Sequence, residues 1–224
     1  MKRGEVTHQP LAPLLVGLAG GSGSGKSSLA SALVTALAPQ PVTRLCHDAY
    51  YRDRSALPPA ERASVNYDVP DAFDQELFLA HLAALRAGVA VRPPRYCFAT
   101  HCRLGEDARV AAAAVVVVEG ILLLWDPRVR AALDLSIFLD APEAVRFERR
   151  LARDVAERGR TPASVLTQLE ATVRDAHATY VEPTRALADL VLTSLGGLSP
   201  LAEIAAALVL DRLARRALAR AGAA

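Results

Sequence analysis

The sequence has little lysine and no surplus of charge of either sign. Of its 26 basic residues only Lys2 and Lys26 are lysines, and the formal net charge is +2 with 22% charged residues. A protein that holds nucleic acid by its phosphates usually carries a clear basic excess. The composition therefore argues against nucleic acid as a partner and describes an ordinary globular surface.

Cysteine and long apolar runs are also scarce. The three cysteines, Cys46, Cys97 and Cys102, include no C-x-x-C pair, and their odd number argues against a disulfide framework or a thiolate zinc site. The longest apolar stretch runs from Val110 to Val118, well short of the ~18 residues of a membrane helix. The N-terminal residues show no export signal. We expect a protein of the reducing cytoplasm, without a membrane segment.

A glycine-rich loop is the most informative feature that is present. The run from Gly20 to Ser27 fits the spacing G-x-x-x-x-G-K-[ST] and follows an apolar segment, Leu14 to Ala19. Glycines let backbone N–H groups point inward as an anion nest, and the following helix offers its positive N-terminus. A flexible Gly/Ser linker is the alternative, but linkers rarely separate an apolar strand from a helical pattern. The loop predicts a nucleoside triphosphate site at Gly20, Gly21, Ser22, Gly23, Ser24, Gly25, Lys26, Ser27 and Ser28.

Strand-like and helical patterns alternate along the chain. The strand-like runs are residues 14–19, 42–46, 114–118, 135–139 and 190–193. Helical patterns occupy residues 26–37, 73–87, 142–158, 162–180 and 200–220. This alternation predicts a three-layer α/β fold, in which helices flank a mainly parallel central sheet.

One segment breaks the alternation. Between Val89 and Val110 two prolines precede Tyr96, Phe98 and His101, which alternate with smaller residues. The pattern suggests a β-hairpin arm. Simple packing of the two aromatic rings is the alternative interpretation.

Two carboxylates stand where parallel strands end. Asp48 follows the second predicted strand, where a general base could reach an acceptor hydroxyl, although an aspartate that turns a loop is the commoner case. Glu119 ends the run Val115–Val118, the place where phosphate-loop proteins put the acidic residue that orients Mg²⁺. Lys26 would lie near the β- and γ-phosphates, and Ser27 would ligate the metal.

Four arginines recur at helical spacing on one face of the helix predicted from Pro142: Arg146, Arg149, Arg150 and Arg153. They could clamp phosphates, or they could form a solvated face with i,i+4 pairs to Asp154 and Glu157. Arg158 and Arg160 flank a glycine just beyond, and fork-shaped donors beside a hinge suit a phosphate lid.

Missing motifs exclude two classes of phosphate-loop protein. The Asn-Lys-x-Asp guanine reader of GTPase switches is absent, since no lysine follows Lys26. The Leu-Ser-Gly-Gly-Gln signature of transporter ATPases does not precede the acidic strand at Glu119. A small-molecule kinase survives both comparisons.

The sequence resembles the uridine kinase (uridine–cytidine kinase) family of P-loop nucleoside kinases from about Leu14 to about Gly197. The most diagnostic match is Asn66-Tyr67-Asp68-Val69-Pro70-Asp71-Ala72-Phe73-Asp74, similar to the family's Asn-Phe-Asp-His-Pro-Asp-Ala-Phe-Asp. Further matching segments are 47–51, 94–103, 119–122, 153–160 and 182–184. Departures include Cys97, where the family usually has Asp, and Leu198-Ser199 in place of a polar pair.

The resemblance implies a role for each matching residue. Asp48 would be the base for the ribose 5′-hydroxyl and Asp68 would hold the ribose hydroxyls. Tyr96 and His101 would hydrogen-bond the pyrimidine, with Tyr67 and Phe98 packing the site. The remaining assignments are Arg150, Arg160 and Gln168 on the nucleoside side and Arg153 and Arg158 in the nucleotide lid.

The resemblance also implies an ATP/GTP-dependent, Mg²⁺-requiring kinase of pyrimidine salvage that forms a homotetramer and makes UMP or CMP. Kinases for other acceptors, such as phosphoribulokinase, and a non-catalytic nucleotide sensor are the alternatives. We divide the chain into an N-terminal extension (1–13), a P-loop kinase domain (14–197) with its arm at 89–110 and its lid at 150–165, and a C-terminal helix (198–224) packed on the domain.

Overall fold

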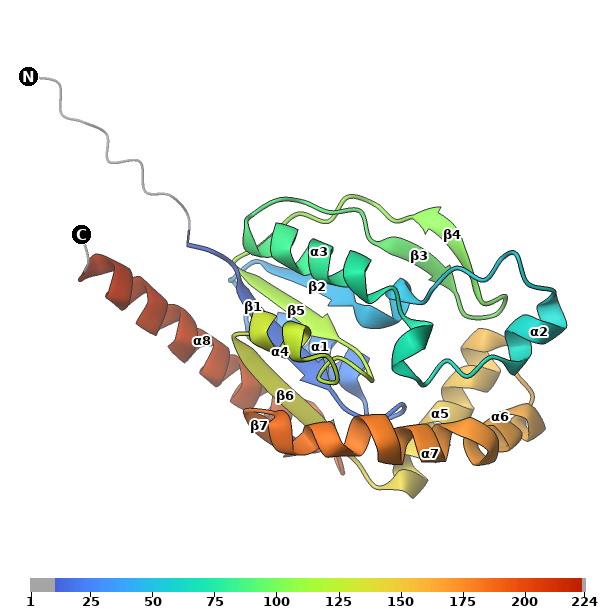
Figure 1. Cartoon of the computed structure of the whole chain (residues 1–224). Helices are drawn as coiled ribbons and strands as arrows, with labels where there is room; N and C mark the ends of the chain where they lie inside the picture. The colour runs from blue at the N-terminus through green and yellow to red at the C-terminus, as the bar shows by residue number, and fades with distance from the viewer. Residues whose placement is uncertain (1–10, 223–224) are drawn as a thin grey trace, which may run out of the picture.

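The computed structural model describes residues 11–222 and has a parallel sheet at its centre (Figure 1). Five strands form the sheet in the order β2-β5-β1-β6-β7, and all neighbours are parallel. Their bounds are β1 Leu14–Ala19, β2 Val42–Cys46, β5 Val115–Glu119, β6 Leu135–Asp140 and β7 Leu190–Thr193. Each predicted strand is confirmed to within a residue or two.

The helices lie on both faces of this sheet and at its carboxyl end (Figure 1). Their bounds are α1 Lys26–Ala36, α2 Pro59–Ser64, α3 Gln75–Arg86, α4 Pro127–Ala132, α5 Glu143–Arg158, α6 Pro162–Gln168, α7 Arg174–Ala176 and α8 Ser199–Ala221. A π-helical stretch, Leu169–Val173, joins α6 to α7, and a second one, His177–Val181, continues from α7, so residues 162–181 form one helical segment. The short helices α2 and α4 and these π-helical stretches were not foreseen from the sequence.

Successive side chains of each strand point to opposite faces of the sheet, and so the fold has two apolar cores. In β1, Leu14, Val16 and Leu18 pack with α1 and α8, whereas Leu15 and Ala19 pack on the opposite face with α3 and the arm. A strand that is apolar on both sides is the signature of a parallel sheet covered by two helical layers. The predicted three-layer α/β fold is confirmed.

The C-terminal helix packs along α1. Arg212 and Arg216 donate to the backbone and the carboxylate of Asp134, at the start of β6, and so fasten α8 to the sheet. The predicted N-terminal extension, except for residues 11–13, lies outside the described residues, as do residues 223–224.

The predicted hairpin also forms. Strands β3 (Pro94–Cys97) and β4 (Cys102–Glu106) pair antiparallel, and a bridge between Val91 and Val110 closes the base of the arm. The arm stands beside α3 and beyond the end of the main sheet (Figure 1).

Candidate active site

The glycine-rich loop connects β1 to α1 and its glycines are required by geometry. Gly20, Gly23 and Gly25 all adopt positive φ angles (139°, 80° and 98°), a region that L-residues rarely enter. A Cβ added at Gly23 would lie 2.1 Å from the carbonyl oxygen of Arg146 on α5. The loop therefore holds its backbone shape only with these glycines, and α5 presses directly against it.

Lys26 and Glu119 meet below the loop. The Lys26 ammonium is buried and donates to the carbonyl oxygen of Gly21 at 2.9 Å. Burial lowers the pKa of Lys26, opposed by the charges of Glu119 and Asp48. For the carboxylate of Glu119 burial acts in the other direction and raises the pKa, opposed by the charge of Lys26 and by the Ser27 hydroxyl. That hydroxyl donates to Glu119 Oε2 at 2.9 Å. The four groups form one electrostatic unit.

Sheet register explains why these side chains meet. Glu119 on β5 lies opposite Leu18 on β1 and Cys46 on β2, so all three strands end at the same level. Asp48 follows two residues after Cys46. Parallel strands thus deliver the loop and both acidic residues to one edge, the edge at which open α/β sheets bind ligands.

The turn that carries Asp48 is held by its neighbour His47. The His47 ring stacks on Phe73 (centroids 4.2 Å apart, 10° between planes), and its Nε2 lies 3.1 Å from Gln75 Oε1. Burial lowers the pKa of His47 to about 4, so the ring is neutral at physiological pH. One carboxylate oxygen of Asp48, Oδ1, is buried and has no hydrogen-bond partner among the described residues. A buried acceptor of this kind is ready to take a donor.

Asp48 opens into a small cavity of about 40 Å³ that also touches Ser22 of the loop. Its walls come from the turn after β2, the segment before α3, the arm, and helices α5 and α6. The lining residues are Ser22, Asp48, Tyr51, Tyr67, Asp68, Tyr96, Phe98, His101, Ile121, Arg150, Arg153, Arg158, Arg160 and Gln168.

Aromatic rings line one side of the cavity. Tyr67 and His101 stack with centroids 4.3 Å apart and planes 12° from parallel. Tyr96 lies against Tyr51 at 5.2 Å, and the Phe98 ring lies 4.3 Å from the guanidinium carbon of Arg158. Such a lining provides flat apolar surface with few polar groups, which suits a planar neutral ligand.

His101 is a neutral polar group within this lining. Burial lowers the pKa of His101 to about 4, assisted by the positive charges of Arg160 and Arg158. The neutral ring can both donate and accept a hydrogen bond.

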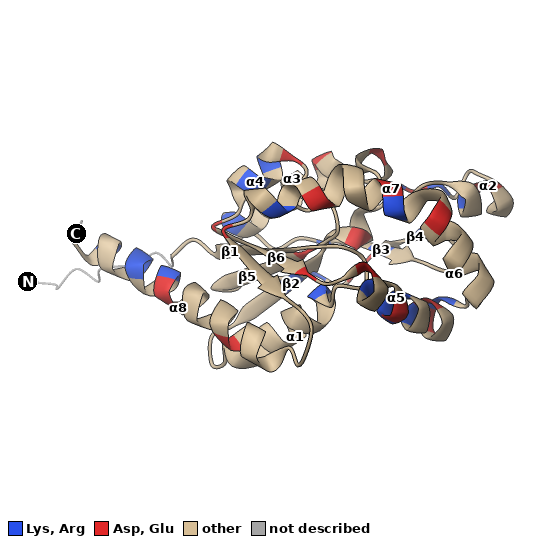
Figure 2. Cartoon of the chain, turned by 90° about the horizontal axis from the view of Figure 1, so that it is seen from below, with Lys and Arg blue, Asp and Glu red and all other residues tan. Residues whose placement is uncertain are grey.

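Another side of the cavity is rich in arginine, and Asp154 lies at the centre of these arginines. It was assigned no role from the sequence. Its carboxylate is 0% exposed and lies 2.8 Å from Arg153, 3.1 Å from Arg160, 3.4 Å from Arg158 and 3.6 Å from Arg150. Burial alone would raise the pKa of Asp154, but the arginines outweigh it and the pKa lies below its usual value. Figure 2 shows blue and red residues close together along α5.

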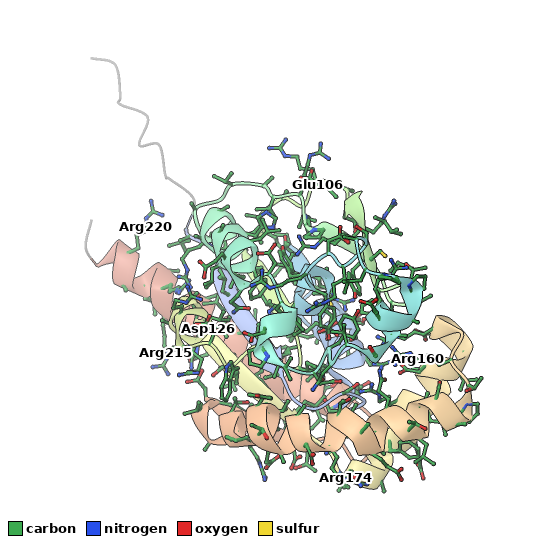
Figure 3. The ribbon with its side chains drawn as sticks, turned by 45° about the vertical axis from the view of Figure 1, so that its right-hand side comes forward. Glu106, Asp126, Arg160, Arg174, Arg215 and Arg220 are labelled. Atoms are coloured by element: carbon green, nitrogen blue, oxygen red, sulfur yellow. The ribbon has the colours of Figure 1, made fainter. Side chains whose placement is uncertain are left out.

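A second set of contacts ties α5 to α6. Arg150 Nη2 and Arg160 Nη1 both donate to Gln168 Oε1, at 2.8 and 2.6 Å. Arg150 also lies 3.7 Å from Asp68. Burial raises the pKa of Asp68, and the positive charge of Arg150 partly offsets that rise. Arg160 sits beside α6 at the end of the molecule away from α8 (Figure 3).

The arginine side also reaches the glycine-rich loop. Arg153 Nη2 lies 3.4 Å from Ser22 Oγ, and Arg149 donates to Ser24 O at 3.3 Å and to Ser194 Oγ at 3.0 Å. Of the two i,i+4 pairs considered for a solvated helix face, Arg150–Asp154 forms, at 3.6 Å, whereas Arg153 turns inward to Asp154 instead of pairing with Glu157.

The structure thus brings most of the candidate residues together around one cavity. The rest of the glycine-rich loop, with Lys26, Ser27 and Glu119, lies outside the lining of that cavity, and Ser27 and Ser28 are exposed at the start of α1. Sequence reasoning missed Tyr51, Ile121 and Asp154. Asp154 stands four residues from both Arg150 and Arg158, and that spacing was the available signal.

A wider cavity of about 930 Å³ lies beyond the small one. It runs between α2, the tip of the arm and α6. Phe98, His101, Arg158, Arg160 and Gln168 line both cavities and therefore stand between them.

Known proteins match this chain over most of its length. A uridine kinase of Chloroflexus aggregans is 45% identical over 190 residues, which cover 85% of this chain and 90% of the relative. A uridine kinase of Deinococcus deserti is 42% identical over 195 residues, covering 87% and 94%.

A solved phosphoribulokinase from Rhodobacter spheroides shares the fold, with a TM-score of 0.58 and 16% identity over 81% of this chain and 70% of that one. Residues 15–198 match the family described as Phosphoribulokinase / Uridine kinase family. The chain is a P-loop kinase, a phosphotransferase, and belongs to that family.

Proposed function

We propose that the protein transfers the γ-phosphoryl group of ATP or GTP to the 5′-hydroxyl of uridine or cytidine, giving UMP or CMP. The observation that carries the proposal is the cavity in which Asp48 lies between Ser22 of the phosphate loop and the aromatic arm. An acceptor there would present its hydroxyl to a base on one side and to the phosphates on the other.

The nucleoside would occupy the small cavity once the arm and α6 open. Asp68 would accept hydrogen bonds from the ribose hydroxyls, and Tyr96 and His101 would hydrogen-bond the base. Tyr67 and Phe98 would cover its faces. Neutral aromatic groups favour a nucleobase over a second phosphate, and the nearby arginines are already paired with Asp154 and Gln168.

The donor nucleotide would bind residues 20–28. Backbone N–H groups of the loop and the Lys26 ammonium would hold the β- and γ-phosphates. Arg153 and Arg158 would close over them from α5, and the contact of Arg153 with Ser22 supports this placement.

Ser27 and Glu119 fit a magnesium ion. A hydroxyl and a carboxylate already within 2.9 Å of one another are hard oxygen ligands of the kind that Mg²⁺ prefers, with phosphates and water completing its shell. When bound, Mg²⁺ neutralises charge on the transferring phosphoryl group.

In the reaction Asp48 would take the proton of the 5′-hydroxyl as that oxygen bonds to the γ-phosphorus, while the bond from the γ-phosphorus to the β,γ-bridging oxygen breaks and ADP or GDP leaves. Lys26 and the arginines would offset the charge on the phosphoryl oxygens. His47 would keep the Asp48 turn in place through its contacts with Phe73 and Gln75.

The test compares acceptors and one pair of variants. ADP or GDP release should be stimulated by uridine or cytidine and not by adenosine or ribulose 5-phosphate; stimulation by the sugar phosphate would favour a phosphoribulokinase-like acceptor, and by none of them a nucleotide sensor. Asp48→Asn should lower kcat by roughly 10²–10⁴-fold, the usual contribution of a general base, with the nucleotide Kd unchanged. Asp71→Asn, at an exposed aspartate of a neighbouring turn, is the matched control. Unchanged turnover in Asp48→Asn would remove Asp48 from the mechanism.

A homotetramer in a reducing cytoplasm, as expected from the resemblance and the cysteines, stays a prediction. The boundaries of the extension, the kinase domain and the C-terminal helix do so as well.

A further inference from the structure

Two cysteines face each other at the tip of the arm. Cys97 ends β3 and Cys102 begins β4, and the two are directly paired in the antiparallel register. Residues so paired have Cα atoms about 4.5–5.5 Å apart, and a disulfide needs about 4.4–6.8 Å. The backbone therefore already satisfies the spacing of a disulfide, although both thiols are free.

The two sulfur atoms meet the same residue of the loop between them. Cys102 Sγ lies 3.4 Å from the carbonyl oxygen of Thr100. Hydrogen bonds from the Thr100 hydroxyl and backbone lower the pKa of the Cys97 thiol. Both side chains are partly exposed. An accessible thiol with a lowered pKa is the better nucleophile at neutral pH, so Cys97 is the attacking residue of the pair.

The loop enclosed by this pair carries two walls of the nucleoside cavity. Phe98 and His101 lie between the cysteines in sequence and separate the 40 Å³ cavity from the 930 Å³ one. Pockets for drug-sized ligands measure about 300–1,000 Å³, so the 40 Å³ cavity is too small for a nucleoside as it stands. Phe98 and His101 are side chains that a nucleoside entering from the wider cavity would meet first.

We propose that Cys97 and Cys102 form a reversible disulfide that restrains the arm loop and hinders access of the nucleoside. The inference rests on the proposed function of the arm. The oxidant is a low-molecular-weight disulfide: the Cys97 thiolate attacks one of its sulfurs and releases the first thiolate. The Cys102 thiolate then attacks Cys97 Sγ and releases the second. Two protein thiols become one disulfide, two small thiols are formed, and a dithiol reverses the reaction.

The experiment compares the full-length enzyme after treatment with glutathione disulfide and after reduction by dithiothreitol. Intact mass should show the loss of two hydrogens on oxidation, and peptide mapping should place the bond between residues 97 and 102. The KM for uridine should rise roughly tenfold, a size typical of coupling between two sites, while the KM for ATP stays constant. Reduction should restore the original value.

Three variants locate the effect. In the presence of oxidant, Cys97→Ser should keep the KM for uridine that the wild-type enzyme has in its reduced state. Cys102→Ser should retain glutathione on Cys97, because no resolving thiol remains. Cys46→Ser, on β2, should respond as the wild type does.

Two outcomes would overturn the inference: no 97–102 bond at any glutathione ratio, or a bond that leaves the KM for uridine unchanged. A response that persists in Cys97→Ser would also overturn it. If uridine is not a substrate of the reduced enzyme, the proposed function fails, whereas the mass measurement still reports whether the disulfide forms.

Discussion

The two halves of the site are held in different ways. On the phosphate side, Lys26, Ser27 and Glu119 are fixed by the ends of β1 and β5, whose register the backbone sets. On the acceptor side, the cavity walls come from the arm, α5 and α6, and no shared sheet register fixes them; side-chain contacts such as Arg160 with Gln168 and Phe98 with Arg158 link them.

This difference suggests a division of labour. A kinase must hold phosphates in fixed geometry, yet it must also open to admit an acceptor and then close to exclude water. The sheet provides the fixed half. The contacts of α5 with the arm and with α6, Phe98 on Arg158 and Arg150 with Gln168, provide a half that can separate without disturbing the sheet.

The largest effect should come from breaking the fixed half. Gly23→Ala places a Cβ where the Arg146 carbonyl oxygen stands, at 2.1 Å, and at a φ of +80°. Backbone of both the loop and α5 must move, so nucleotide affinity should fall by at least roughly 100-fold, or about 3 kcal/mol. Isothermal titration calorimetry with ATP measures this loss.

Gly88→Ala is the matched control, because Gly88 has a φ of +78° but nothing within 4 Å of the added Cβ. It should cost about 1–2 kcal/mol of stability and leave nucleotide affinity unchanged. Wild-type affinity in Gly23→Ala would show that the loop is less constrained than its contacts indicate.

The same division explains what the sequence could predict. The loop spacing, the valine run before Glu119 and the strand pattern are local features, and adjacent parallel strands bring their ends together once the sheet forms. From these the fold and the phosphate side follow with small errors in element bounds. The assignments of Tyr96, His101 and Gln168 came from family resemblance, because no local pattern places an arm opposite α6.

Asp154 shows most clearly what could not be predicted from the sequence. On a helical wheel it is one acidic residue among arginines, and an exposed i,i+4 pair is the ordinary interpretation. Only the tertiary structure shows that Arg160, beyond the helix end, turns back to the same carboxylate. The π-helical stretches after α6 and the single 3₁₀ turn His47–Tyr50 were not predicted for a similar reason, since packing determines them.

An intermediate effect is expected where the two halves join. Asp154→Asn removes the charge of a buried carboxylate that contacts four arginines, and it should cost about 3 kcal/mol, as breaking a buried ion pair does. The value of kcat/KM should fall with it, because Arg153 and Arg160 lose their anchor. Urea unfolding and steady-state kinetics measure the two losses.

The Asp154 effect should also depend on pH. Because its pKa is lower in the folded state than in the unfolded one, its contribution is complete at neutral pH and is lost as the pH falls below about 4. Asp154→Asn should lose less stability on acidification than the wild type. The control Asp211→Asn breaks an exposed pair with Arg215 and should change stability by less than about 0.5 kcal/mol; equal losses in both variants would argue against the role of Asp154.

The smallest effect should come from the acceptor side. His101→Ala removes a hydrogen-bonding group from the cavity wall without touching the phosphate loop, so the KM for uridine should rise roughly tenfold with kcat changed less, as for one lost hydrogen bond. Because the pKa of His101 lies at about 4, the wild-type KM should be flat from neutral pH to about pH 5 and rise only below it. Leu104→Ala, at an exposed residue of β4, is the control on the same arm. If uridine saturation were the same in His101→Ala and Leu104→Ala, His101 on the arm would not recognise the base. Base recognition on the acceptor side would then have to come from other side chains of the cavity.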